Sequence, residues 1–281
     1  MSSGRAIDHL VLAVPDLDRA GEAYEELGFT LTPRAAHDDR MGTSNRLAQF
    51  AGRNFIELLE VDRPDRLLDH DCLVDPPFFS FGAHNRAFIE GGSGVSMLVF
   101  QGNDARADIQ RFQAQGIATH APFDFQRPAR LPDGTKATVA FTLAFATSPD
   151  MPRLAFFVCQ NRAPDYFWKP DFQDHANGAL DLIRVYLASP DPAREARFLS
   201  RLFGGESDPI EYGFRVACGE AQEIWVVDPD VLADKDPSLR ATAKTQPHLA
   251  GFCLRCRQAR DLIPASEAQG AFIKWIAEDG A

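Results

Sequence analysis

The apolar positions of the chain recur in a strand-then-helix pattern. Residues 7–14 form an almost continuous apolar run, which is typical of a buried strand. A helix is predicted after Asp16, where apolar residues follow at helical spacing, at Leu17, Ala20, Tyr24 and Leu27. Gly28 ends this helix, since glycine adopts a positive φ angle without a steric cost.

The same pattern recurs twice more at a constant interval. The glycines that end the three predicted helices are Gly28, Gly116 and Gly204, so each step is 88 residues long (116 − 28 and 204 − 116). A fourth copy is fainter, with a strand at 249–256 and a helical stretch that ends at Gly270. This copy begins early and has only 11 residues after its glycine, so the fourth unit is predicted to be incomplete.

Strand-like runs separated by turn signals follow each predicted helix. They are expected at 30–35, 46–51 and 55–61 in unit one, at 129–131, 137–146 and 153–160 in unit two, and at 214–217 and 223–227 in unit three. Residues 132–135, Pro-Asp-Gly-Thr, predict a tight hairpin turn. Each unit is therefore βαβββ, and since one such sheet leaves an apolar face uncovered, we expect the units to pair.

We expect an α+β fold in which three clear βαβββ units and one partial unit form two lobes. The first lobe, residues 1–162, holds units one and two. Residues 163–178 form an aromatic linker, and residues 179–281 form the second lobe.

Composition narrows the class of function. The chain has 281 residues, 45% of them apolar and 25% charged, which are the proportions of soluble globular proteins. A formal net charge of −11 argues against a nucleic-acid partner, because such surfaces need an excess of Lys and Arg. The chain has no apolar run of the ~18 residues that a membrane helix needs, and its first residues lack the apolar core of a signal peptide. Its 5 cysteines are scattered and odd in number, which argues against a disulfide framework. We therefore expect a cytoplasmic protein that binds a small molecule, without a nucleic-acid or membrane partner.

Two ionisable residues stand on otherwise apolar strand faces. Strand alternation makes His9 the one ionisable side chain on its face of residues 7–13, and Glu57 the one on its face of residues 55–61. A lone carboxylate on a buried face is costly unless it is paired or bound to a metal. Either His9 and Glu57 form a hydrogen-bonded pair in a dry core, or they form a metal or substrate site. If Glu57 is buried without a metal, desolvation is expected to raise its pKa.

Other polar and aromatic segments allow two interpretations. His175 precedes an Asn-Gly turn, and it either caps a strand end or is carried by the linker over the first cavity towards His9. The run Tyr-Phe-Trp at 166–168 is either a packed bridge between the halves or a lid that lines an apolar pocket. Residues 37–39, His37 followed by two aspartates, are expected in a solvated loop, and the CxxC pair at 253–256 is expected to be structural.

Several stretches of the chain are similar to sequences of one known superfamily. They are IDHLVLAVPDLDRAGEAYEELGF, with a His in the first strand and a closing Gly, and NFIELLEV, with Glu57 in the fourth strand. FFVCQNRAPDYFWKP and HANGALDLIRVYLASPDP resemble a glyoxalase-like subfamily of bacterial proteins. The chain therefore resembles the vicinal oxygen chelate superfamily, which includes glyoxalases, bleomycin-resistance proteins and extradiol dioxygenases. The resemblance covers units one to three well and is weak beyond His248.

The resemblance implies U-shaped sheets around a cavity, with metal ligands from the first and fourth strands. For this chain it implies a divalent metal (Fe, Mn, Zn or Ni) held by His9, Glu57 and His175, with Glu57 and His175 moving protons. The matching positions of units two and three carry no standard ligand, being Ser96-Met97, Phe156, Arg184 and Trp225. A third ligand must therefore come from elsewhere, and the candidates are His175, His84, His120 and Gln160.

Two functions follow from the resemblance. One is a metal-assisted lyase, isomerase or dioxygenase that acts on a small, partly apolar substrate with vicinal oxygens. The other is a non-catalytic binding protein of the bleomycin-resistance type with a vestigial metal site. The incomplete fourth unit leaves open whether a second copy completes it in a homodimer.

Overall fold

The structure, a computed structural model, describes residues 4–130, 136–235 and 245–278. Unit one consists of β1 (Ile7–Ala13), α1 (Leu17–Glu26), β2 (Ala35–Ala36), β3 (Ser44–Gln49) and β4 (Phe55–Glu60). After α2 (Phe81–Ile89), unit two consists of β5 (Gly94–Gln101), α3 (Ala105–Ala114), β6 (Ala118–Thr119), β7 (Phe123–Arg130), β8 (Lys136–Thr147) and β9 (Ala155–Asn161).

Two short 3-10 helices, η1 (Pro164–Tyr166) and η2 (Pro170–Phe172), lie in the segment that leads to unit three. Unit three consists of β10 (Ala179–Ala188), α4 (Pro192–Phe203), β11 (Ser207–Ile210), β12 (Gly213–Cys218) and β13 (Gln222–Val227). The described remainder comprises α5 (Pro229–Lys235), β14 (His248–Cys256) and β15 (Phe272–Ala277). No described helix is long and apolar enough to cross a membrane.

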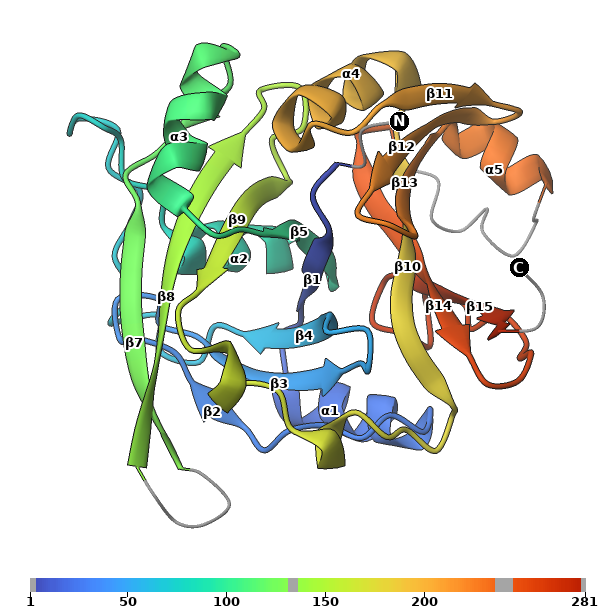
Figure 1. Ribbon diagram of the computed structural model, residues 1–281, viewed down its shortest axis with the longest axis horizontal. Coiled ribbons are helices and arrows are strands. Elements are labelled where there is room, and N and C mark those ends of the chain that lie inside the picture. The colour runs from blue at the N-terminus through green and yellow to red at the C-terminus, as the bar shows by residue number, and fades with distance from the viewer. Residues whose placement is uncertain (1–3, 131–135, 236–244, 279–281) are drawn as a thin grey trace.

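The strands form one continuous sheet of 15 strands, which consists of one curved half in each lobe. In the first lobe the order is β2-β3-β4-β1-β5-β9-β8-β7, and in the second lobe it is β11-β12-β13-β10-β14-β15 (Figure 1). The two halves meet where Leu249 of β14 pairs with Val95 of β5. The predicted α+β fold of paired βαβββ units is confirmed.

The same pairing rule builds both lobes. In the first lobe, β1 lies parallel to β4 and antiparallel to β5. In the second lobe, β10 lies parallel to β13 and antiparallel to β14. The first and fourth strands of a unit are therefore neighbours, and this adjacency positions the site described below.

The prediction of a helix in the fourth unit is wrong. Among the described residues between β14 and β15 the chain makes turns, and Gly270 takes a φ of 90° without ending a helix. Ile263 instead forms an antiparallel bridge with Ile273, and Pro264 follows it directly. A residue that bridges to a strand uses its backbone groups outside a helix, and residues 265–270 after it are in turns, so no helix joins β14 to β15. The hairpin predicted at 132–135 lies outside the described residues.

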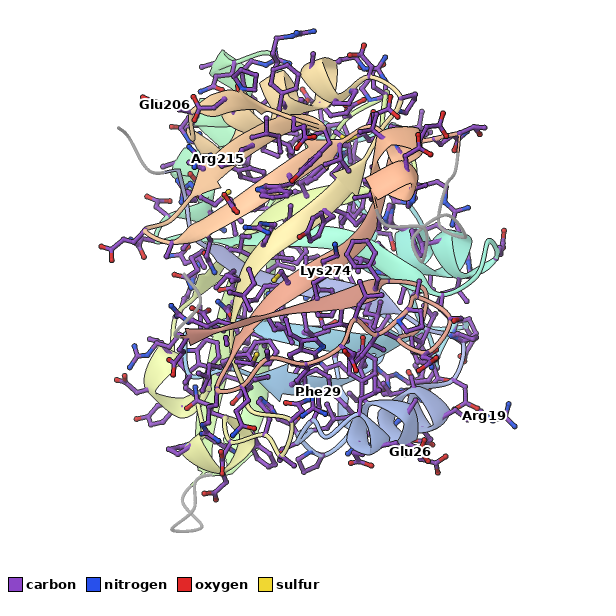
Figure 2. All side chains as sticks on the ribbon, turned by 90° about the vertical axis from the view of Figure 1, so that its right-hand side faces the viewer. Arg19, Glu26, Phe29, Glu206, Arg215 and Lys274 are labelled. Carbon is purple, nitrogen blue, oxygen red and sulfur yellow. The ribbon has the colours of Figure 1, made fainter. Side chains whose placement is uncertain are left out.

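The main hydrophobic core extends through both lobes. Phe203 of α4 stacks on Phe100 of β5, and it also contacts Phe156 of β9. Phe29, just after α1, stacks on Trp275 of β15. Aromatic side chains from both lobes therefore pack against each other at the boundary between the lobes. Figure 2, turned by 90° about the vertical axis from the view of Figure 1, shows the strands of the second lobe, with Lys274 of β15 labelled.

Candidate functional site

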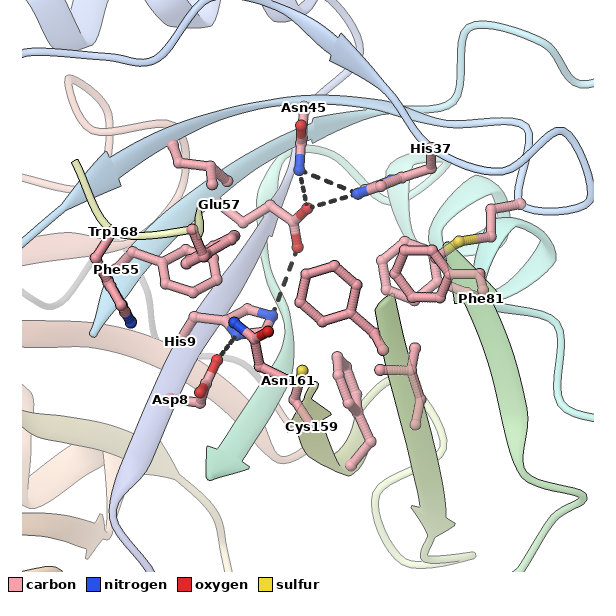
Figure 3. Close-up of a pocket in the computed structure, with 17 residues that line it drawn as sticks. Asp8, His9, His37, Asn45, Phe55, Glu57, Phe81, Cys159, Asn161 and Trp168 are labelled. Atoms are coloured by element: carbon pink, nitrogen blue, oxygen red, sulfur yellow. Dashed lines mark hydrogen bonds and ion pairs between the residues drawn. The ribbon is translucent and has the colours of Figure 1, made fainter. Parts of the chain in front are cut away.

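The parallel pairing of β1 and β4 brings His9 and Glu57 together inside the first lobe. His9 pairs with Phe55 in the strand register, and Val11 pairs with Glu57, so the two ionisable side chains are diagonal neighbours. Both residues are buried, with 5% and 4% of their surfaces exposed. His9 Nε2 lies 3.6 Å from Glu57 Oε2 (Figure 3). The structure therefore brings together the two residues that strand alternation singled out.

A bulge in β1 adds Asp8 to the same site. The register with β5 shifts between Ile7, opposite Phe100, and His9, opposite Val99, so Asp8 has no counterpart of its own on β5. A bulge of this kind re-aims a side chain. Both Asp8 and His9 line one cavity, and Asp8 Oδ1 lies 2.6 Å from His9 Nδ1. Simple alternation along β1 would place Asp8 on the opposite face of the strand from His9.

His37 and Asn45 complete the polar cluster. Asn45 Nδ2 donates to Glu57 Oε1 at 2.6 Å, and His37 Nε2 lies 3.3 Å from the same oxygen. His37 Nδ1 bonds to Thr43 Oγ1 at 2.8 Å. The expectation that His37 lies in a solvated loop is wrong, because its side chain is only 8% exposed. Its neighbour Asp39 does lie at the surface, with 67% of its side chain exposed.

The surroundings of Glu57 lower its pKa. Burial acts to raise that pKa, but the hydrogen bond and charge of His37, the charge of His9 and the hydrogen bond of Asn45 outweigh burial. The expected rise of the Glu57 pKa is therefore wrong. The expectation considered desolvation alone, and the carboxylate has three polar partners.

His175 does not belong to this cluster, which corrects its prediction as a metal ligand and proton carrier. Its Nδ1 accepts the backbone N–H of Thr30 at 3.0 Å, and its Nε2 donates to the carbonyl of Gln49 at 2.8 Å. The ring also packs on Phe29 and Phe50. Both ring nitrogens are therefore occupied by backbone groups, and His175 ties the linker to the end of β3, as in its strand-capping interpretation.

The other candidate third ligands also lie outside the cluster. Gln160 accepts from the backbone N–H of Ala105 and donates to the carbonyl of Asn103. His84 and His120 pack against Phe79. None of these residues lines the cavity that contains Glu57.

The cluster forms the polar wall of a cavity in the first lobe. Most of the remaining lining is aromatic, namely Phe55, Phe81, Phe125, Phe141, Phe157, Phe167 and Trp168. Phe167 and Trp168 come from the linker, so the linker does line an apolar pocket. A second cavity, on the far side of Asn45, Leu47 and Phe167, shares these three residues and is lined also by Lys169 and Arg34.

The equivalent position in the second lobe has different chemistry. Arg184 pairs with Glu223, and Tyr186 pairs with Trp225, which is the register that His9, Phe55, Val11 and Glu57 have in the first lobe. Arg184 lies 3.8 Å above the Trp225 ring and forms an ion pair with Glu223 at 2.5 Å. The position therefore holds a cation stacked on a ring rather than an imidazole beside a carboxylate. Cys253 and Cys256 are buried free thiols.

The donor set of the cluster is that of a divalent metal site, although the side chains do not form a ready-made centre. Within the described ranges, no group of three or more His, Cys, Asp or Glu side chains is arranged to hold an ion as it stands. Two imidazoles and one carboxylate are nevertheless a known ligand set, and Asp8 and Thr43 bind the far ring nitrogens of His9 and His37, as outer partners of metal ligands do. Asn45 Oδ1 is buried without a hydrogen-bond partner among the described residues. In their chemistry, these residues fit a divalent ion.

Comparison with known families agrees with this architecture. The family model described as a glyoxalase-like domain matches residues 7–203, and the chain belongs to this family. The resemblance to the vicinal oxygen chelate superfamily is thereby confirmed. The match covers all of units one and two and the first part of unit three, and therefore includes His9, His37 and Glu57. No curated protein matches the chain.

Solved structures show the same fold at low sequence identity. A hypothetical protein from Staphylococcus aureus is 14% identical, with a TM-score of 0.74 over 97% of this chain and 99% of its own. The Mn(II)-bound glyoxalase from Novosphingobium aromaticivorans is 12% identical, with a TM-score of 0.52 over 99% of this chain and 83% of its own. A fusion of a xylose isomerase-like TIM barrel with 4-hydroxyphenylpyruvate dioxygenase is 15% identical, with a TM-score of 0.51 over 92% of this chain and 37% of its own. At these identities the likeness concerns the fold alone.

Proposed function

We propose that the chain is a metal-dependent enzyme, a lyase, isomerase or dioxygenase, whose site is the cavity of the first lobe. Its ligands to a divalent ion (Fe, Mn, Zn or Ni) would be His9, His37 and Glu57, with His37 in place of His175. Its substrate would be small and partly apolar, with vicinal oxygens. The observation that carries the proposal is the convergence of two imidazoles on one buried carboxylate.

The cluster has two places for positive charge beside Glu57. An ionised carboxylate only accepts hydrogen bonds, so His9 donates its Nδ1–H to Asp8. The other ring nitrogen of His9 lies 3.6 Å from Glu57 Oε2, and His37 Nε2 lies 3.3 Å from Glu57 Oε1. Either protons on these two nitrogens or a bound divalent ion would supply positive charge beside the carboxylate.

The residues of the chain would perform distinct tasks in the reaction. A bound divalent ion would supply Lewis-acid stabilisation of negative charge on substrate oxygens. Asp8 and Thr43 hold the two imidazoles in one orientation. The lowered pKa of Glu57 keeps its carboxylate ionised at neutral pH, as a ligand or a base requires. The aromatic lining excludes water and thereby strengthens electrostatic interactions in the cavity.

One observation favours a second candidate function, a small-molecule-binding protein without turnover. Glu57 obtains partners from His9, His37 and Asn45 alone, so the cluster can persist as a polar network. Such a network would orient a ligand in the apolar cavity without a metal. This is the vestigial-site alternative of the bleomycin-resistance type.

Metal analysis of the untagged protein after dialysis against metal-free buffer distinguishes the two functions. We expect about one divalent ion per chain, retained in Glu60→Gln and lost in Glu57→Gln. Glu60 is the matched control, because it lies on the same strand but pairs with Arg34 outside the cavity. Circular dichroism would establish that both variants are folded. A wild-type protein that holds none of Fe, Mn, Zn or Ni, even after titration with each, would contradict the enzyme and favour the binding protein.

A further inference from the structure

The cavity of the first lobe is enclosed by a closed circuit of aromatic rings. Its members are the imidazoles of His9 and His37 and six phenylalanine rings, Phe55, Phe81, Phe125, Phe141, Phe157 and Phe167. Successive ring centroids lie between 4.2 Å and 6.3 Å apart around the whole circuit. The rings come from β1, β4, β7, β8, β9, α2, the linker and the loop before β3, so the complete tertiary structure is needed to form the circuit.

Apart from the two imidazoles, the ionised side chains of the described lining are carboxylates. The described lining includes the carboxylates of Asp8 and Glu57 but no Lys or Arg side chain. Cys159 also lines the cavity, and burial, with Asp8 and Glu57 nearby, raises its pKa well above the usual value, so its thiol stays neutral. The positive charge available to the cavity is therefore that of a protonated imidazole or of a bound cation.

Two basic side chains near this region line the neighbouring cavity. Arg34 and Lys169 line that second cavity, on the other side of Asn45, Leu47 and Phe167. Arg34 already pairs there with Asp18, Glu60 and Asp62. Negative charge on a ligand inside the aromatic circuit would consequently lie beside two carboxylates and apart from these two cations.

We propose that the first-lobe cavity selects a ligand whose buried part is an aromatic ring without negative charge. An aromatic ring stacks on the enclosing rings, and a neutral or cationic substituent is tolerated by the two carboxylates, since ring faces also attract cations. A ligand carboxylate is rejected, because two like charges in a partly desolvated cavity repel. The proposal deepens the proposed function and rests on it only in assigning the same cavity as the ligand site.

Three probes that share a benzene ring and differ in the charge of its substituent test the selection. They are benzyl alcohol, benzylamine as its ammonium ion, and benzoate, titrated at pH 7 into chelator-treated protein. Trp168 is the reporter, because its ring lies 6.0 Å from Phe55 in the cavity wall, and Trp168→Phe identifies the signal that comes from Trp168. We expect the dissociation constant of benzoate to be at least tenfold higher than those of the other two probes. Equal or tighter binding of benzoate, or no binding of any probe, would overturn the proposal.

Charge-neutralising variants test the cause of the selection. Asp8→Asn and Glu57→Gln should each narrow the difference between benzoate and benzyl alcohol, whereas Glu60→Gln should leave it unchanged. An unchanged ratio in folded Asp8→Asn and Glu57→Gln proteins would show that the two carboxylates do not reject the anion. Because the titrations use chelator-treated protein, their outcome is independent of the metal analysis. Charge selection without metal binding would retain this proposal and refute the metal enzyme. Metal binding without charge selection would refute this proposal and retain the metal enzyme.

Discussion

The histidines of the first lobe show how surroundings decide what one residue type does. His37 has polar partners at both ring nitrogens, Thr43 at one and Glu57 with Asn45 at the other. His84 and His120 instead pack on Phe79, and His120 Nε2 bonds to Thr147 Oγ1 at 3.1 Å. His84 Nε2 and His120 Nδ1 are buried without a hydrogen-bond partner among the described residues. Burial lowers the pKa of both these imidazoles to about 4, so at neutral pH they are uncharged packing residues.

This burial predicts a loss of stability in mild acid. An imidazole titrates near pH 6.5 in the unfolded chain, and the pKa of His84 falls to about 4 in the folded protein. The unfolded state therefore binds more protons between these values. The stabilisation is complete above pH 6.5 and declines as the pH falls towards 4, by at most about 1.4 kcal/mol per pH unit for each imidazole.

Urea denaturation at several pH values between 7 and 4.5 measures this effect. The free energy of unfolding of His84→Leu should depend less steeply on pH than that of the wild type, because one proton-binding group is removed. Identical slopes for the two proteins would show that His84 is not buried in its neutral form.

At the scale of elements, the unit helices share one start signal. Each of α1, α3 and α4 begins after an aspartate whose side chain accepts the backbone N–H three residues later, at Asp16, Asp104 and Asp191. Such N-caps satisfy backbone donors that have no partner within the helix. In α4, Pro192 adds a fixed φ angle at the first helical position. These signals are local, which is why the starts of these helices were predictable.

The N-cap of α4 predicts the effect of one substitution. Asp191→Ala should lower the free energy of unfolding by about 1 kcal/mol, whereas Asp191→Asn should keep most of it, because an amide oxygen also accepts the N–H of Arg194. Chemical denaturation measures both values. Asp191 lies in the second lobe away from the cavity lining, so binding of the aromatic probes should not change. Equal losses in the two variants would mean that the cap hydrogen bond is not the cause.

At the scale of the whole molecule, the lobes are joined through side chains as well as through the sheet. Asn54 of the first lobe donates to Asp181 Oδ1 at 2.5 Å and accepts the backbone N–H of Leu182 at 2.9 Å. Phe203 of α4 packs on Phe100 across the same boundary. One contiguous core includes buried residues of units one, two and three. The two lobes therefore share a large part of the apolar surface that stabilises each of them.

The shared core predicts that the lobes unfold together. Calorimetry of the wild type should show one cooperative transition, and Phe203→Ala should lower its midpoint while leaving it single. The fully buried ring of Phe203 fills space between the lobes, so its removal should cost about 3–5 kcal/mol. A variant in which two transitions separate would indicate lobes that are stable independently of each other.

The amino-acid sequence by itself determined the repeat, the three unit helices and the convergence of His9 with Glu57. These features follow from periodicity and from the pairing of like units, and both are local or repeated properties of the chain. Tertiary structure alone decided the remaining features of the site. Asp8 enters through a bulge that depends on the register of β1 with β5, and His37 enters on a loop where its ring packs against Phe81 and Phe125. His175 is held elsewhere, because its two ring nitrogens bond to the backbone of Thr30 and Gln49. These partners are distant in sequence, so no local pattern of residues could predict them.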